Sequence, residues 1–239
     1  MYLELHWAAQ LASAPGTTLL EPKPDASHTN LTVDFEARGA LVGHPVGGRR
    51  AALRLNDVTL LVLDDAYAVT SSLPLPGETM ASALAWLARA FEVPELKRPE
   101  HELPSCPVGA GAPFTETDGS ELAMCFAFAQ NQLTSVVHRE KSAPVRVWPH
   151  HFDIATLISL EGERSIGVGM SPGDSSYGRP YFYVTPWPYP PPDRELPPLA
   201  AGTWHREGWT GAVHFLGEAE GRMSDFLKDA IEAARLILK

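Results

Sequence analysis

The sequence is poor in cysteine and in clustered positive charge. Cys106 and Cys125 are the only cysteines among 239 residues, too few for a disulfide framework or for a zinc site built from cysteines. Lys and Arg number 19 against 29 Asp and Glu, for a formal net charge of −10, and no basic cluster exceeds the pair Arg49–Arg50. Because proteins that bind phosphate backbones or anionic membranes carry a basic patch, we expect neither nucleic acid nor a membrane as a partner.

Long apolar runs are missing as well. No segment approaches the ~18 consecutive apolar residues of a membrane-spanning helix. The beginning, MYLELHWAAQ, lacks the basic start and apolar stretch of a secretory signal. We therefore predict a cytoplasmic protein. The hydrophobic fraction of 44% and charged fraction of 20% are those of a folded chain with a sizeable core.

Hydrophobic spacing predicts both helices and strands. Helices are expected over 2–13, ended by Pro15 and Gly16, over 77–93, over 120–139, and from Ser224 to the end. Alternation of Leu31, Val33 and Phe35 predicts a half-buried strand, and further strands are expected over 51–63, 145–187 and 210–216. The fold class is therefore α+β.

Two antiparallel sheet-plus-helix halves are expected, an arrangement that also fits a pseudo-duplication. Residues 1–100 would form an N-terminal helix-strands-helix half. Residues 101–143 would form a Pro-rich linker and a connecting helix, and residues 144–239 a C-terminal half that carries the candidate site.

Alternation along three strands of the C-terminal half predicts one aliphatic face, covered by the last helix, and one polar, aromatic face. The residues expected on the polar face are His151, Asp153, Gly167, Gly169, Tyr181, Tyr183 and Trp187. Glycines inside strands indicate close approach of a ligand or of another backbone. Aromatic walls with a few polar groups are typical of small-molecule pockets.

We expect this pocket to be completed by Tyr177 from the loop MSPGDSSYGRPY and closed by Trp204 and His205. The same face could instead pack against the helix over 120–139, with its polar groups satisfied by hydrogen bonds. The loop itself has a simpler explanation, since Gly173, Asp174 and Gly178 are typical turn residues.

Three functions remain open on these residues. Binding of a small organic ligand on the aromatic face is the leading hypothesis, and no motif indicates a cofactor. The second is a hydrolase. It would use either a metal on His151 and Asp153, with a third ligand from His205, His214 or Asp174, or acid–base chemistry by His151 with Asp153 or Asp174. The third is an assembly protein whose aromatic face forms a subunit interface in a homo-oligomer.

Four short blocks of the chain resemble a bacterial family of proteins with a domain of unknown function. The family's blocks are LHxWxQ, an Asn-His strand start, PVxxFWxxFDLA and a Tyr-rich strand. The first is matched by His6, Trp7 and Gln10, and the second by His28, with Ser27 in place of Asn. The third is matched by Trp148, Phe152, Asp153 and Ala155, and the fourth by Tyr181, Tyr183, Trp187 and Pro188. The resemblance implies a shared α+β fold and no particular activity. It also implies that His6, Gln10 and His28 belong to the same site as Asp153.

Overall fold

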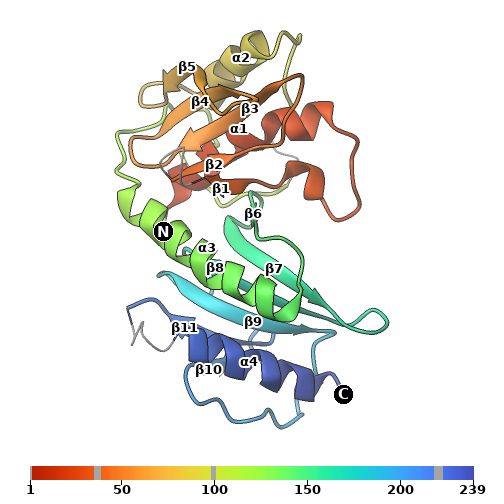
Figure 1. Cartoon of the computed structure of the whole chain (residues 1–239). Helices are drawn as coiled ribbons and strands as arrows, with labels where there is room; N and C mark the ends of the chain where they lie inside the picture. Colours follow the sequence, from red (N-terminus) through yellow and green to blue (C-terminus); the bar gives the residue numbers. More distant parts are fainter. Residues whose placement is uncertain (1, 35–38, 98–100, 218–222) are drawn as a thin grey trace. The chain divides into compact units, whose positions relative to one another are not determined.

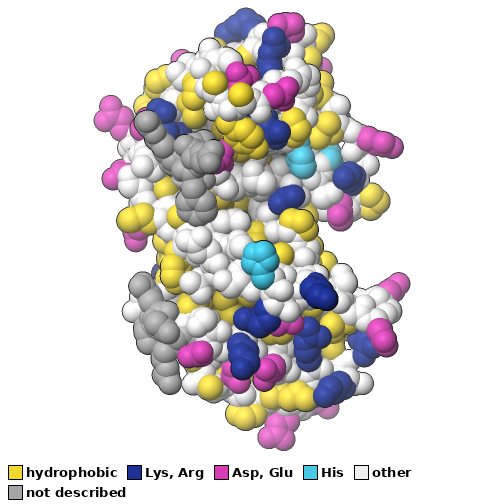
Figure 2. All heavy atoms as spheres, viewed as in Figure 1, with side chains coloured by type: hydrophobic (Ala, Val, Ile, Leu, Met, Phe, Trp, Pro, Cys, Tyr) yellow, Lys and Arg dark blue, Asp and Glu magenta, His cyan; other side chains and the backbone are white. Residues whose placement is uncertain are grey.

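The structure, a computed structural model, describes residues 2–34, 39–97, 101–217 and 223–239 (Figure 1). The chain divides into two compact units. The N-terminal unit comprises residues 2–127 and 146–152, and the C-terminal unit comprises residues 128–145 and 153–239. Among the described helices, none is both long and apolar enough to cross a membrane. On the face drawn in Figure 2, acidic side chains lie among the basic ones.

The N-terminal unit is built on an antiparallel meander of five strands in the order β1-β2-β3-β4-β5. Its elements are α1 (Leu3–Leu19), the 3-10 helix η1 (Ser27–Thr29), β1 (Thr32–Asp34), β2 (Ala40–Val42), β3 (Arg49–Arg54), β4 (Thr59–Asp64), β5 (Val69–Pro74) and α2 (Met80–Ala90). The predicted strand around Leu31 and Val33 is present as β1, whereas Phe35 lies outside the described residues. Further along the chain, Val147 of β6 (Arg146–Trp148) forms a bridge with Leu31.

Helix α1 packs against β2 and β3 and runs through the predicted end at Pro15 and Gly16. A Cβ on Gly16 would lie 2.4 Å from the carbonyl oxygen of His28, and one on Gly43 would lie 2.4 Å from the carbonyl oxygen of Ala12. These glycines therefore allow α1 to approach η1 and β2 closely. The prediction of a helix end was wrong because glycine serves packing here, and tertiary packing outweighs local propensity.

The C-terminal unit holds a second antiparallel sheet, whose strands follow the order β10-β11-β9-β8-β7. Its elements are the end of α3 (Ser120–Glu140), β7 (Asp153–Ser159), β8 (Ser165–Ser171), β9 (Tyr181–Trp187), β10 (Thr203–His205), β11 (Gly211–Phe215) and α4 (Met223–Ile237). The predicted α+β class with two antiparallel sheets is confirmed.

One face of this sheet is aliphatic and is covered by α4, as predicted. Ile166, Val168, Phe182 and Val184 are buried on it, and α4 contacts β8, β9 and β11. Apolar residues spaced along one side of α4 are all buried: Met223, Leu227, Ala230, Ile231, Ala234 and Ile237. Full burial of a Met, Leu, Ile, Val or Phe side chain stabilises the unit by ~1.5–3 kcal/mol.

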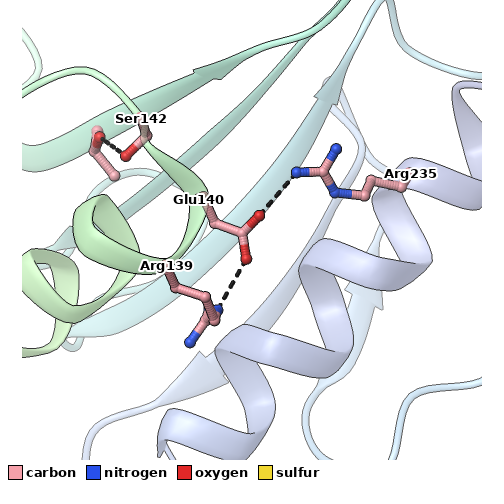
Figure 3. A network of polar contacts seen from close by, with 5 residues as sticks. Arg139, Glu140, Ser142 and Arg235 are labelled. Carbon is pink, nitrogen blue, oxygen red and sulfur yellow. Dashed lines mark hydrogen bonds and ion pairs between the residues drawn. The ribbon is translucent and has the colours of Figure 1, made fainter.

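A polar network joins the end of α3 to α4 (Figure 3). Glu140 accepts hydrogen bonds from Arg139 Nε and Arg235 Nη2, each 2.8 Å long, and only 16% of its side chain is exposed. Burial raises the pKa of this carboxyl, but hydrogen bonds from the two guanidinium groups outweigh burial and leave the pKa below its ordinary value. Ser142 follows, with its hydroxyl 2.8 Å from that of Thr156 in β7.

The compact units do not coincide with the predicted halves. Cys106, Val108 and Phe114, from the segment predicted as a linker, are buried in the N-terminal unit. The boundary between the units falls inside α3, after Ala127. The Pro-rich composition of this segment therefore reflects an irregular packed backbone, which local composition does not distinguish from a linker.

Candidate functional site

The register of the second sheet sets Ala155, Gly169 and Tyr183 in one row. The Tyr183 ring lies directly over Gly169, since a Cβ there would be 2.4 Å from the phenol oxygen and 2.5 Å from Cζ. In the next row, a Cβ on Gly167 would lie 3.0 Å from Thr185 Cγ2. The prediction that the two glycines leave space for a ligand or another backbone was wrong, because the side chains of Tyr183 and Thr185 in β9 lie over them.

Across Gly169, the Tyr183 hydroxyl donates a short hydrogen bond to Asp153 Oδ2. Burial and the neighbouring Asp153 charge raise the pKa of Tyr183 well above its ordinary value of 10.0. The structure therefore places Asp153 and Tyr183 together, as the alternation predicted, and keeps the phenol protonated.

A second phenol–carboxylate pair lies beside the first. Tyr181 donates to Asp174 Oδ2 over 2.5 Å, and Asp174 Oδ1 accepts backbone N–H bonds from Ser176 and Tyr177. Burial, then the bond to Asp174, raises the pKa of Tyr181. Asp174 thus both shapes the loop after β8 and orients Tyr181.

His205 is held at both ring nitrogens. Its Nε2 lies 2.7 Å from the carbonyl oxygen of Glu207, which only accepts, so Nε2 carries the proton. In the neutral ring, Nδ1 then accepts the hydroxyl proton of Tyr177 over 2.9 Å. Burial, with the charge of Asp174, raises the pKa of Tyr177 and keeps it a donor.

Trp209 completes the group, although the sequence argument did not place it there. Its ring stacks on His205, with centroids 4.3 Å apart and planes inclined by 29°, and lies 6.4 Å from the Tyr183 ring. A Cβ on Gly211 would lie 2.5 Å from Trp209 Cζ3, so the indole folds back over the first residue of β11. One feature of the sequence could have indicated this position of Trp209. It lies two residues before Gly211, the glycine that begins β11.

We call this surface the aromatic face. Its side chains are Tyr177, Tyr181, Tyr183, His205, Trp209 and Phe215. Tyr177, Tyr183, His205 and Trp209 are half-buried. At one end, the guanidinium of Arg179 lies 3.8 Å above the Phe215 ring. The face is a preorganised aromatic surface with polar groups beneath it.

The prediction that His151 lies on this strand beside Asp153 was wrong. β7 begins at Asp153, and Phe152 has a left-handed backbone with φ 58°. The two-residue alternation of a strand therefore does not extend back to His151. His151 is exposed in the preceding turn, with its ring centroid 4.2 Å from that of His150.

Two predicted tryptophans also lie elsewhere. Trp204 is next to His205 in β10 and so points to the opposite side of the sheet, where its indole donates to the carbonyl oxygen of Pro197. Trp187, at the far end of β9, is 54% exposed and packs edge-on against Tyr189. The wall position predicted for Trp187 is taken by Trp209.

His6 and His28 belong to the N-terminal unit, whereas Asp153 belongs to the C-terminal unit. His6 Nε2 and Gln10 Nε2 both lie within 2.8 Å of the carbonyl oxygen of Pro149, and the His6 ring stacks on Phe152. These contacts join His6 and Gln10 to Pro149 and Phe152 within the N-terminal unit and do not link them to Asp153.

Two alternatives to a ligand pocket were a metal site and packing of the polar face against the helix over 120–139. In the described part of the chain, no three His, Cys, Asp or Glu side chains form a group suited to a metal ion. The alternative packing against the helix over 120–139 was wrong, since Phe128 of α3 contacts Phe182 on the aliphatic face instead.

Comparison of the chain with protein-family models, with curated protein sequences and with solved structures finds no match. The resemblance to the bacterial family therefore stays a prediction.

Proposed function

We propose that this protein binds a small organic ligand on the aromatic face, by stacking on the pair His205 and Trp209. The proposal is carried by the stacking of these two rings. They lie beside tyrosines whose hydroxyls are already bonded to protein groups. A ring system held in place before binding loses little conformational entropy when a ligand arrives.

The class of ligand follows from what the face offers. The Tyr181 and Tyr183 hydroxyls donate to Asp174 and Asp153, and burial raises the pKa of both phenols, so the polar groups open to a ligand lie at the edge of the face. The loop beside Trp209 adds the exposed hydroxyls of Ser175 and Ser176. A ligand with one flat apolar face and hydroxyl groups at its edge, such as a pyranose, fits this combination.

Catalysis is a weaker candidate on the same residues. The raised pKa values of Tyr181 and Tyr183 keep both as phenols near neutral pH, and both nitrogens of His205 are engaged by protein groups. A general base needs an available lone pair within reach of its substrate. Binding without catalysis therefore fits these contacts best. We include in the proposal a cytoplasmic location, which suits the two buried free thiols.

The test compares two tryptophans of the C-terminal unit. Saturation-transfer NMR with a set of methyl pyranosides identifies a binder, whose affinity is then measured for Trp209→Ala and Trp187→Ala. We expect at least a tenfold loss for Trp209→Ala and no change for the control, Trp187→Ala, which lies against Tyr189. Binding that survives Trp209→Ala, or that Trp187→Ala weakens equally, would refute the proposal. Light scattering on the same samples reports whether the face instead joins two copies.

A further inference from the structure

A small recess in the N-terminal unit has the chemistry of an anion site and is separate from the aromatic face. It has a volume of about 40 Å³ and is lined by Gln10, Ser13, Ala14, Thr17, His28, Thr29, Lys97, His101, Pro149 and His150. A water molecule needs roughly 10–15 Å³ on this measure. The recess therefore has room for about three waters, or for one small polyatomic ion, and not for a nucleotide or a sugar.

The wall of the recess is fixed by hydrogen bonds. Gln10 donates to the carbonyl oxygen of Pro149 over 2.6 Å, and His6 lies 2.8 Å from the same oxygen. Both side chains come from α1, so they hold the Pro149–His150 backbone against this helix. These bonds fix the backbone immediately before His150.

Two histidines that line the recess are His28 and His150. His28 Nδ1 accepts the backbone N–H of Lys23 over 3.2 Å, so the proton of the neutral ring is on Nε2, which can donate. His150 Nδ1 is buried and has no hydrogen-bond partner among the described residues. Buried polar atoms are nearly always satisfied, so this nitrogen indicates a partner outside the chain.

The charge of the lining favours an anion. Lys97 and three histidines contribute to it, and among the described residues that line it none is Asp or Glu, although the whole chain carries −10. Burial and the nearby His151, His101 and His6 lower the pKa of His150 to about 4. A bound anion would oppose these effects and favour the ring form with a proton on Nδ1.

From this geometry we infer that the recess binds a small oxyanion, either inorganic phosphate or a carboxylate, through His28, His150 and Lys97. The ion would accept from the His28 Nε2–H and, once the His150 ring turns to expose its buried Nδ1, from the His150 Nδ1–H, while the exposed Lys97 side chain lies at the rim. This inference does not depend on the ligand proposed for the aromatic face.

The test titrates the full chain with sodium phosphate and, separately, with sodium acetate at constant ionic strength and pH. Long-range proton–nitrogen NMR of the histidine rings gives the response. We expect saturable shifts of His28 and His150, and at least a fivefold weaker affinity in Lys97→Gln. Lys228→Gln, an exposed lysine of α4 in the other unit, is the matched control and should bind as the unchanged chain does.

The outcomes are distinguishable. Saturation by phosphate alone assigns the site to phosphate, and saturation by acetate assigns it to carboxylates. Shifts that do not saturate at tens of millimolar of either salt would overturn the inference, as would equal weakening by Lys97→Gln and Lys228→Gln. Because both lysines are exposed, neither variant is expected to unfold the protein.

Discussion

Gly169→Ala tests the contact on which the aromatic face depends. The new Cβ would lie 2.4 Å from the Tyr183 hydroxyl oxygen, 2.5 Å from Tyr183 Cζ and 2.7 Å from the backbone oxygen of Ile154. The tyrosine could move aside, but a backbone oxygen inside a sheet cannot move without disturbing the ladder. The phenol would then leave Asp153, and the hydrogen bond between them would be lost.

The magnitude follows from three contributions. Overpacking costs ~1–3 kcal/mol, and loss of a hydrogen bond to a charged group costs ~1.5–3 kcal/mol. Alanine restricts the unfolded chain and returns ~0.4–1 kcal/mol. We therefore expect the free energy of unfolding of the C-terminal unit to fall by roughly 2–5 kcal/mol.

Urea unfolding followed by near-ultraviolet circular dichroism measures this loss, because the tyrosines and Trp209 contribute to the signal. Gly178→Ala is the control, since a Cβ there meets no atom within 4 Å. A change of less than about 0.5 kcal/mol in Gly169→Ala would refute the reasoning. So would equal losses in the two variants.

Three further predictions concern other parts of the structure. Arg235→Met should lower the free energy of unfolding by about 1–2 kcal/mol, because Glu140 is largely buried and loses one of its two guanidinium partners. Chemical denaturation measures this loss, and it should be smaller for the control Lys228→Met on the same helix. Since the pKa of His150 falls from 6.5 to about 4 on folding, the unfolded chain binds more protons in that window. Stability should thus decrease as the pH falls from 6.5 towards 4, and melting temperatures of His150→Gln should show a weaker dependence. Gly43→Ala should destabilise the N-terminal unit by about 1–3 kcal/mol, since its Cβ would lie 2.4 Å from a carbonyl oxygen of α1; an unchanged urea midpoint would contradict this packing.

Local periodicity was enough to predict most elements. The stripe Met80, Leu84 and Leu87 marked α2 correctly, and the spacing of Met223 and Leu227 marked the buried side of α4. These predictions succeed because one buried face imposes the period of its own element on the sequence. The same argument placed Asp153 and Tyr183 on one face, since neighbouring strands of a sheet share their faces.

The sequence by itself determined the α+β class, the aliphatic face under α4 and the candidate Tyr–Asp pair. The tertiary structure decided the rest. A left-handed Phe152 removed His151 from the strand, and Trp209 reached the aromatic face from a loop that has no periodicity. His28 and His150 also meet only through long-range packing. A repeating pattern records which face of an element is buried, whereas contacts between loops distant in sequence leave no local period from which to predict them.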